Sequence, residues 1–187
     1  LGPDDVVLVT GGARGITAKI VRHLAAHHGP RFVLLGSSPL DTDVPTDLPA
    51  GADERAIRAH LVAGRKAAGQ PLVPAEIEAE TRRIVKAREM AETLDAVRAS
   101  GCDVEYISAD VRDADTFGAA IAGVYDRHGR IDVVLHGAGV IEDKLIADKT
   151  LESFENVVKT KTGSAFTLAR ALRMETVKCL VFFTSVA

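Results

Sequence analysis

The chain has 187 residues, 47% of them hydrophobic, which suits one domain with a full core. Its formal net charge is −3 with Lys and Arg dispersed along the chain, so it lacks the basic surface that nucleic acid or an anionic membrane would require. No apolar run is long enough for a membrane span and the N-terminus shows no signal-peptide pattern, so we expect a soluble, cytoplasmic protein.

The first predicted element is a strand that ends in a glycine turn. Residues 6–9 read Val-Val-Leu-Val, which is typical of a buried strand, and Thr10-Gly11-Gly12 follows. From Ile16 the apolar residues recur at three- and four-residue intervals, which predicts a helix. Such a turn presents backbone N–H groups and the positive end of a helix, and both favour a phosphate. The spacing Gly11-x-x-x-Gly15 departs from the common G-x-G-x-x-G, so these residues alone equally fit a turn that binds nothing.

A second strand is predicted at residues 31–35, closed by a glycine and two serines. In a doubly wound sheet the end of this strand lies beside the adenosine ribose, where an acidic residue favours NAD. No acidic residue occurs there before Asp41, and Ser37, Ser38 and Arg14 can donate hydrogen bonds to a 2′-phosphate. The pattern therefore favours NADP.

The next stretch contains more helix than a crossover to a third strand needs. Residues 39–51 have a proline-rich loop composition, and helices are predicted from 53 to about 68 and from 74 to about 100. One of these helices is sufficient for the crossover, so residues 39 to about 75 are interpreted as a helical insertion. It carries no chemical motif, and it fits a cover for the cofactor site, a docking surface for a partner domain or a solvated hairpin.

The rest of the chain continues the alternation of strand and helix. Strands are predicted at 104–107, 131–136 and 177–183, with helices at 114–128 and 151–174. The fold class is therefore α/β, a doubly wound parallel sheet of Rossmann type, C-terminally incomplete, with a helical insertion after the second strand. The fourth strand ends in Gly-Ala-Gly at 137–139, and two strands that both end in glycine turns indicate a ligand close to their carboxyl ends.

No metal site is predicted. His23 and His27 have helical i, i+4 spacing but no accompanying carboxylate or cysteine ligand, so two exposed histidines are the simpler interpretation. Cys102 and Cys179 are far apart in sequence and suit reduced core thiols.

Three motifs at these separations resemble the short-chain dehydrogenase/reductase superfamily: Thr10-Gly11-Gly12-Ala13-Arg14-Gly15-Ile16, Asp110-Val111 and His136-Gly137-Ala138-Gly139-Val140. More narrowly, the chain is similar to the ketoreductase domains of multidomain polyketide and polyunsaturated fatty acid synthases. The stretches 136–144 and 148–150 and the helical insertion are most similar to the polyunsaturated fatty acid synthase type. The resemblance covers residues 4–187 and implies one NADP-binding ketoreductase domain over 1–187, as a fragment.

The resemblance also implies site residues. The first glycine turn would hold the phosphates of NADPH, the end of the third strand its adenine, and the second glycine turn its nicotinamide. The implied cofactor-binding residues are Thr10, Gly11, Gly12, Arg14, Gly15, Ile16, Ser37, Ser38, Asp110, Val111, Gly137, Ala138 and Gly139. The implied catalytic residues are Lys161, where most of the superfamily has asparagine, and Ser185, which would donate to the substrate carbonyl. A tyrosine acid is expected about a dozen residues beyond Ser185, so the fragment lacks it.

The implied activity is NADPH-dependent reduction of a 3-oxoacyl thioester to the 3-hydroxyacyl thioester. Its partners would be an acyl carrier protein that holds the 3-oxoacyl chain, and neighbouring synthase domains. Two alternatives are a non-catalytic Rossmann module of a megasynthase, structural or nucleotide-binding, and a free-standing short-chain reductase acting on a small substrate. Lys161 also fits a surface lysine with a solvated ammonium group, and Ser185 a turn residue at the end of a strand.

Overall fold

The computed structural model describes residues 1–40, 44–45, 47–49 and 51–184. The elements in chain order are β1 (Val6–Thr10), α1 (Gly15–His28), β2 (Arg31–Gly36), α2 (Glu54–Ala67), α3 (Pro74–Ala99), β3 (Val104–Ser108), α4 (Ala114–His128), β4 (Val133–His136), the short 3-10 helix η1 (Ile146–Asp148), α5 (Leu151–Val158), the π-helical segment η2 (Lys159–Gly163), α6 (Ser164–Ala171) and β5 (Cys179–Phe182).

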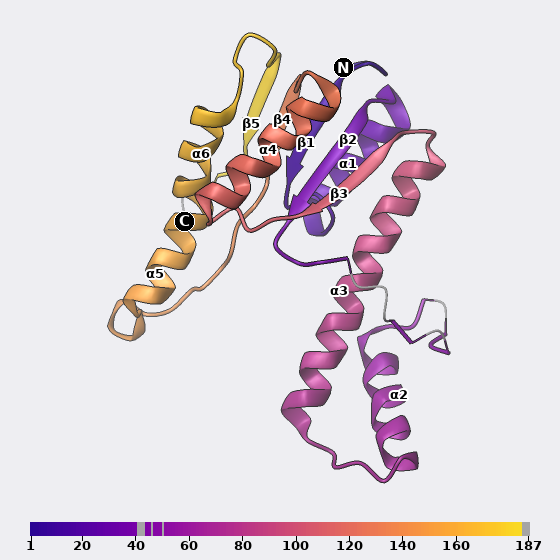
Figure 1. Cartoon of the computed structure of the whole chain (residues 1–187). Helices are drawn as coiled ribbons and strands as arrows, with labels where there is room; N and C mark the ends of the chain where they lie inside the picture. The colour runs from indigo at the N-terminus through magenta and orange to yellow at the C-terminus, as the bar shows by residue number, and fades with distance from the viewer. Residues whose placement is uncertain (41–43, 46, 50, 185–187) are drawn as a thin grey trace. The chain divides into compact units, whose positions relative to one another are not determined.

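Within these residues, five parallel strands form one sheet in the order β3-β2-β1-β4-β5 (Figure 1). The predicted parallel α/β sheet with a helical segment after β2 is confirmed. Thr10 at the end of β1 pairs with Leu35 of β2 and His136 of β4, so the strands end together at one edge. The strand order reverses at β1, and this is where ligands bind in doubly wound sheets.

The sheet is apolar on both faces because helices cover both. Side chains from one face share a core with α4 and α6; this core includes Val6, Leu8, Phe117, Ile121 and Leu168. Val7 and Val9 alternate with that set, are fully buried, and belong to the face where α1 lies (Figure 1). The continuous apolar run of β1 follows from this double burial.

The helical segment after β2 is largely a compact unit of its own. The chain divides into one unit of residues 1–39 and 93–187 and a second unit of residues 40–92. In the second unit, Leu48, Ile57 and Ile84 form a small core. Arg58 of α2 pairs with Glu78 of α3 at 2.9 Å, so α2 and α3 are joined by both apolar and charged contacts.

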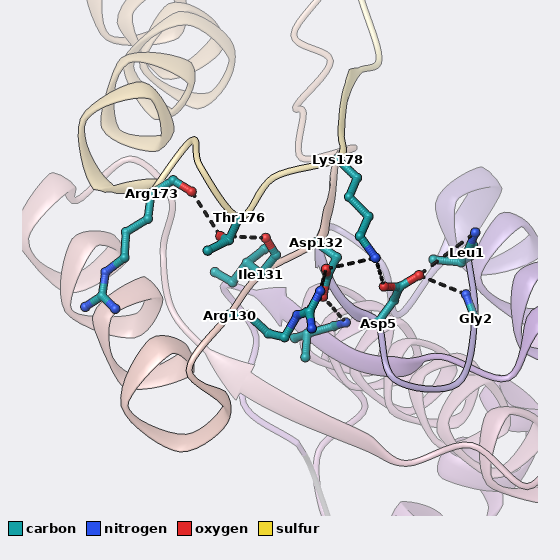
Figure 2. Close-up of polar contacts among 10 residues, drawn as sticks. Leu1, Gly2, Asp5, Arg130, Ile131, Asp132, Arg173, Thr176 and Lys178 are labelled. Carbon is teal, nitrogen blue, oxygen red and sulfur yellow. Dashed lines mark hydrogen bonds and ion pairs between the residues drawn. The ribbon is translucent and has the colours of Figure 1, made fainter.

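Charged residues at the amino edge of the sheet form a closed cluster that includes Asp5, Arg130, Asp132 and Lys178 (Figure 2). The buried Asp132 carboxylate accepts hydrogen bonds from the Val6 amide at 2.9 Å and from Arg130 Nε at 2.8 Å, and lies 3.3 Å from Lys178 Nζ. Burial raises the pKa of Asp132, but the hydrogen bonds from Arg130, Val6 and Lys178 outweigh it and hold the pKa below its usual 3.8. These charges therefore connect the starts of β1, β4 and β5.

The helix predicted over 151–174 differs from the structure in two respects. It is interrupted by the π-helical segment η2, and it ends at Ala171, because Leu172 is already extended. Two strands are also shorter than predicted, since β4 begins at Val133 and β5 covers Cys179–Phe182. Cys102 is a buried core thiol as expected, whereas Cys179 is exposed.

Across the described part of the chain, no helix has the length and apolar character needed to cross a membrane. The same residues contain no group of three or more His, Cys, Asp or Glu side chains arranged to hold a metal ion.

Candidate functional site

The turn after β1 requires glycine at three positions, two with a left-handed backbone and one without room for a side chain. Gly11 and Gly15 have φ values of 69° and 63°, which side chains rarely adopt. A Cβ at Gly12 would lie 2.7 Å from Cγ1 of Val9, so only glycine fits there. Helix α1 starts at Gly15 with no side-chain cap and no acidic residue in its first turn, so its positive end suits an anion.

The second glycine turn, after β4, lies directly against the first. A Cβ at Gly11 would be 3.1 Å from the amide nitrogen of Ala138, and one at Gly137 would collide with the Thr17 hydroxyl of α1. The Thr10 hydroxyl accepts a hydrogen bond from the Ala138 amide at 3.1 Å. The two turns that the sequence predicts on separate strands therefore form one surface at the carboxyl edge of the sheet.

Lys161 extends from η2 to this surface. Its half-buried side chain donates a hydrogen bond from Nζ to the Phe183 carbonyl at 2.8 Å. A Cβ at Gly139 would lie 2.8 Å from Cε and 2.9 Å from Nζ of Lys161, so the ammonium group packs over the glycine turn. Burial lowers the pKa of Lys161. A lysine whose ammonium group extended into solvent would make neither of these two contacts.

Ser37 and Ser38 follow β2, and Asp110 and Val111 follow β3. Ser37 is exposed, and the backbone of Ser38 is held by a hydrogen bond of 2.6 Å from the Tyr106 hydroxyl to its carbonyl. The Asp110 carboxylate accepts from Arg112, and this interaction lowers the pKa of Asp110. The side chain of Val111 is buried in the core that it shares with Phe117 and Ile121 of α4.

Arg14 and Ile16 flank the start of α1. Arg14 occupies the N-cap position with an extended backbone, and its side chain is exposed. Ile16 is 75% exposed, which is unusual for a large apolar residue and leaves it available for a ligand. Ser185, the other predicted catalytic residue, lies outside the described residues.

Neither described tyrosine is placed beside Lys161. The Tyr106 hydroxyl donates to Ser38, and the Tyr125 hydroxyl accepts from the Arg173 amide at 2.9 Å. Both phenols therefore have structural roles.

Two polar interactions near the turns were not predicted from the sequence. His136 is buried at the end of β4 between the Thr10 and Ser164 hydroxyls. In addition, Arg112 links Asp110 to Asn156 of α5. In the sequence His136 is visible as part of the motif at 136–140, but its partners are 126 and 28 residues away.

Known proteins resemble this chain over nearly its whole length. The family model for the KR domain matches residues 5–187. The chain is 29% identical over 194 residues to one of the subunits of the polyunsaturated fatty acid synthase of Thraustochytrium sp., covering 100% of this chain and 7% of that protein. It is 24% identical over 178 residues to polyketide synthase PksM of Bacillus subtilis, covering 95% of this chain and 3% of that protein.

Among solved structures, an N-terminal ketoreductase from the macrolactin assembly line superposes with a TM-score of 0.70 at 24% identity, covering 100% of this chain and 29% of that chain. At that identity the superposition establishes the fold alone. The chain spans less than a third of each of these three proteins. With a family match over nearly its whole length, the chain belongs to the KR domain family of polyketide and polyunsaturated fatty acid synthases, with a short-chain dehydrogenase/reductase fold.

Proposed function

We propose that the protein carrying this chain uses NADPH to reduce the 3-oxo group of a thioester on an acyl carrier protein to the 3-hydroxyacyl thioester. KR domains belong to the NAD(P)-dependent oxidoreductases. The observation that carries the proposal is the contact between the two glycine turns, with the Lys161 ammonium group packed over Gly139.

The residues at the first glycine turn fit a dinucleotide. A Cβ at Gly15 would meet nothing within 4 Å, so the backbone is open to solvent where the positive end of α1 emerges. The pyrophosphate would be held by residues 11–16, and the nicotinamide would lie near residues 137–139. When bound, NADPH supplies the hydride.

Lys161 would act on the oxygen of the reacting carbonyl. As hydride reaches the carbonyl carbon, negative charge develops on that oxygen, and a fixed, partly desolvated cation stabilises it. The bond from Nζ to the Phe183 carbonyl holds the ammonium group in place before substrate arrives. Ser185 would donate a hydrogen bond to the same oxygen, and a tyrosine outside residues 1–187 would supply the proton.

The proposed preference for NADPH over NADH rests on the residues at the end of β2. Ser37 and Ser38 follow the strand there, and the described residues 37–40 include no carboxylate that would repel a 2′-phosphate. Arg14 adds a cation at the start of α1. We therefore infer that NADPH binds more tightly than NADH.

The proposed partners are the carrier protein and neighbouring synthase domains. Large apolar side chains are exposed along the segment that leaves the second glycine turn, namely Val140, Ile141, Leu145, Ile146, Leu151 and Phe154. Exposed apolar groups of this extent are typical of surfaces that another protein surface covers.

The experiment uses the full-length protein. NADPH binding is followed by fluorescence titration, and reduction of a 3-oxoacyl thioester surrogate is followed by NADPH absorbance and mass spectrometry of the product. We expect Lys161→Ala to lower kcat on the order of 100-fold or more while the Kd for NADPH changes only a few-fold. Lys159→Ala is the matched control, because this exposed lysine of the same segment pairs with Glu155 at 2.7 Å.

The alternatives give different results. NADPH binding without reduction of the thioester would favour a non-catalytic nucleotide-binding module, and absence of binding would favour a structural one. Reduction of small ketones with no activity on the thioester would favour a short-chain reductase acting on small substrates.

A further inference from the structure

The buried imidazole of His136 lies between two hydroxyl groups. Its Nδ1 is 2.7 Å from Oγ1 of Thr10, and its Nε2 is 2.9 Å from Oγ of Ser164. All three side chains are 1% exposed or less. Phe182 of β5 packs edge-on against the ring. In such a dry site each polar hydrogen requires an acceptor, so the direction of each hydrogen bond can be worked out.

The hydrogen bonds of Ser164 determine whether Nε2 of His136 carries a hydrogen. Its hydroxyl has one hydrogen, and Oγ lies 2.5 Å from the carbonyl oxygen of Thr160, which can only accept. With that hydrogen directed to Thr160, the Ser164 oxygen must accept from His136. The Nε2 nitrogen therefore carries a hydrogen.

The hydrogen bonds of Thr10 determine whether the other ring nitrogen, Nδ1, carries a hydrogen. Its oxygen already accepts from the Ala138 amide at 3.1 Å, so its own hydrogen needs an acceptor. Nδ1 of a neutral imidazole provides one at 2.7 Å. Burial lowers the pKa of His136 to about 4, and the nearby positive charge of Lys161 acts in the same direction. The neutral ring with hydrogen on Nε2 thus satisfies every group.

The result is a directed chain of hydrogen bonds. It runs from the Ala138 amide to Thr10, from Thr10 to His136, from His136 to Ser164, and from Ser164 to the Thr160 carbonyl. One end lies in the second glycine turn. The other end lies within η2, next to Lys161, whose carbonyl is also 3.2 Å from Ser164 Oγ.

We propose that His136 is a positioning residue that fixes the helical segment bearing Lys161 relative to both glycine turns. As a statement about catalysis this rests on the proposed function. The His136 side chain is buried at the end of β4 and acts through Thr10 and Ser164. The backbone hydrogen bonds of a π-helical segment run from i to i+5, and Ser164, which directly follows η2, is hydrogen-bonded both to His136 and to the Thr160 carbonyl within η2.

The test separates the two ends of the chain of hydrogen bonds in the full-length protein. Ser164→Ala removes the acceptor beside Lys161 and is expected to lower kcat about 10- to 100-fold, with the Kd for NADPH changed less than about threefold. Thr10→Val removes the hydroxyl beside the glycine turns and is expected to raise the Kd for NADPH about 10-fold, whereas Thr10→Ser keeps the hydroxyl and restores binding. His136→Phe is expected to combine both effects.

His128→Asn is the matched control, because this largely buried histidine of α4 has Glu105 as its partner instead of the chain of hydrogen bonds. It is expected to leave kcat and Kd unchanged. If His136 had only a structural role, Ser164→Ala, Thr10→Val and His136→Phe would all lower Tm, and none of them would change kcat and the Kd for NADPH by different factors. That result, or wild-type kinetics in Ser164→Ala and Thr10→Val, would overturn the proposal.

Hydrogen–deuterium exchange gives a readout that needs neither cofactor nor substrate. His136→Phe is expected to increase exchange both in residues 137–140 and in residues 159–165, and His128→Asn in neither. An increase confined to one segment, or none, would overturn the coupling. If both segments respond but the wild-type protein neither binds NADPH nor reduces the thioester, the proposed function fails while the coupling stands.

Discussion

Gly139→Ala is predicted to disable the site while leaving the fold intact. The added Cβ would lie 2.8 Å from Cε and 2.9 Å from Nζ of Lys161, whereas ordinary contact is 3.4–4 Å. Gly139 has no left-handed backbone, so the alanine introduces no backbone strain. The flexible end of Lys161 must therefore retreat by roughly 1 Å, and a displacement of this size costs catalysis on the order of 100-fold.

The effect on stability should be small. Moving the ammonium group weakens its hydrogen bond to the Phe183 carbonyl, which costs about 1 kcal/mol because water can replace it at this half-buried position. Replacing glycine by alanine returns about 0.5 kcal/mol by restricting the unfolded chain. The free energy of unfolding should therefore change by less than about 1 kcal/mol.

The assay is a double-mutant cycle on kcat in the full-length protein, with urea unfolding for stability. Gly139→Ala should lower kcat in the wild-type background and have little further effect in Lys161→Ala, because the side chain it displaces is already gone. Gly163→Ala is the control, since its Cβ would meet only Lys159 at 3.9 Å. An equal loss of kcat in both backgrounds would refute the collision with Lys161 as the cause.

Three further predictions concern stability. Asp132→Asn should lower the free energy of unfolding by about 2 kcal/mol, measured by urea titration, because it weakens charge-assisted hydrogen bonds to a buried carboxylate whose partners Arg130 and Lys178 are themselves about half exposed. The pKa of Asp132 is lower in the folded protein than its usual 3.8, so its contribution to the free energy of unfolding is present above pH 3.8 and is lost as the pH falls through the folded pKa. The wild-type Tm should therefore decline on acidification more steeply than that of Asp132→Asn. Gly12→Ala should cost about 1–3 kcal/mol by overpacking against Val9, and a wild-type Tm would contradict this. Tyr106→Phe should cost about 1 kcal/mol through loss of the hydrogen bond to Ser38, with kcat unchanged.

Much of the fold was predictable because its signals are local. The apolar run of β1, the glycines after it and the change to helical period occupy adjacent residues, so strand, turn and helix follow from the sequence directly. The same holds for Asp53, whose side chain caps α2 by accepting from the Ala56 amide at 2.8 Å. The parallel order of the sheet then follows from the alternation of strands and helices.

The parts that sequence reasoning missed depend on contacts between distant residues. The segment 151–174 has a regular helical pattern, and nothing in its period indicates that five residues, Lys159–Gly163, adopt a π-helix. His136 was visible only as part of a family motif. Its role emerges when β1, β4 and α6 come together, since Thr10 is 126 residues before it and Ser164 is 28 residues after it.

The two edges of the sheet satisfy their polar groups in different ways, and this explains why stability and activity should respond to different substitutions. At the amino edge, Asp132 forms ion pairs with Arg130 and Lys178, so loss of either cation leaves a buried carboxylate with fewer partners and acts on the free energy of unfolding (Figure 2). At the carboxyl edge, glycines keep the backbone open and a neutral His136 directs hydrogen bonds without adding charge. A protonated imidazole there would repel Lys161 and require Thr10 to reverse its hydrogen bond, so the low pKa of His136 is a condition for the ammonium group to remain beside Gly139.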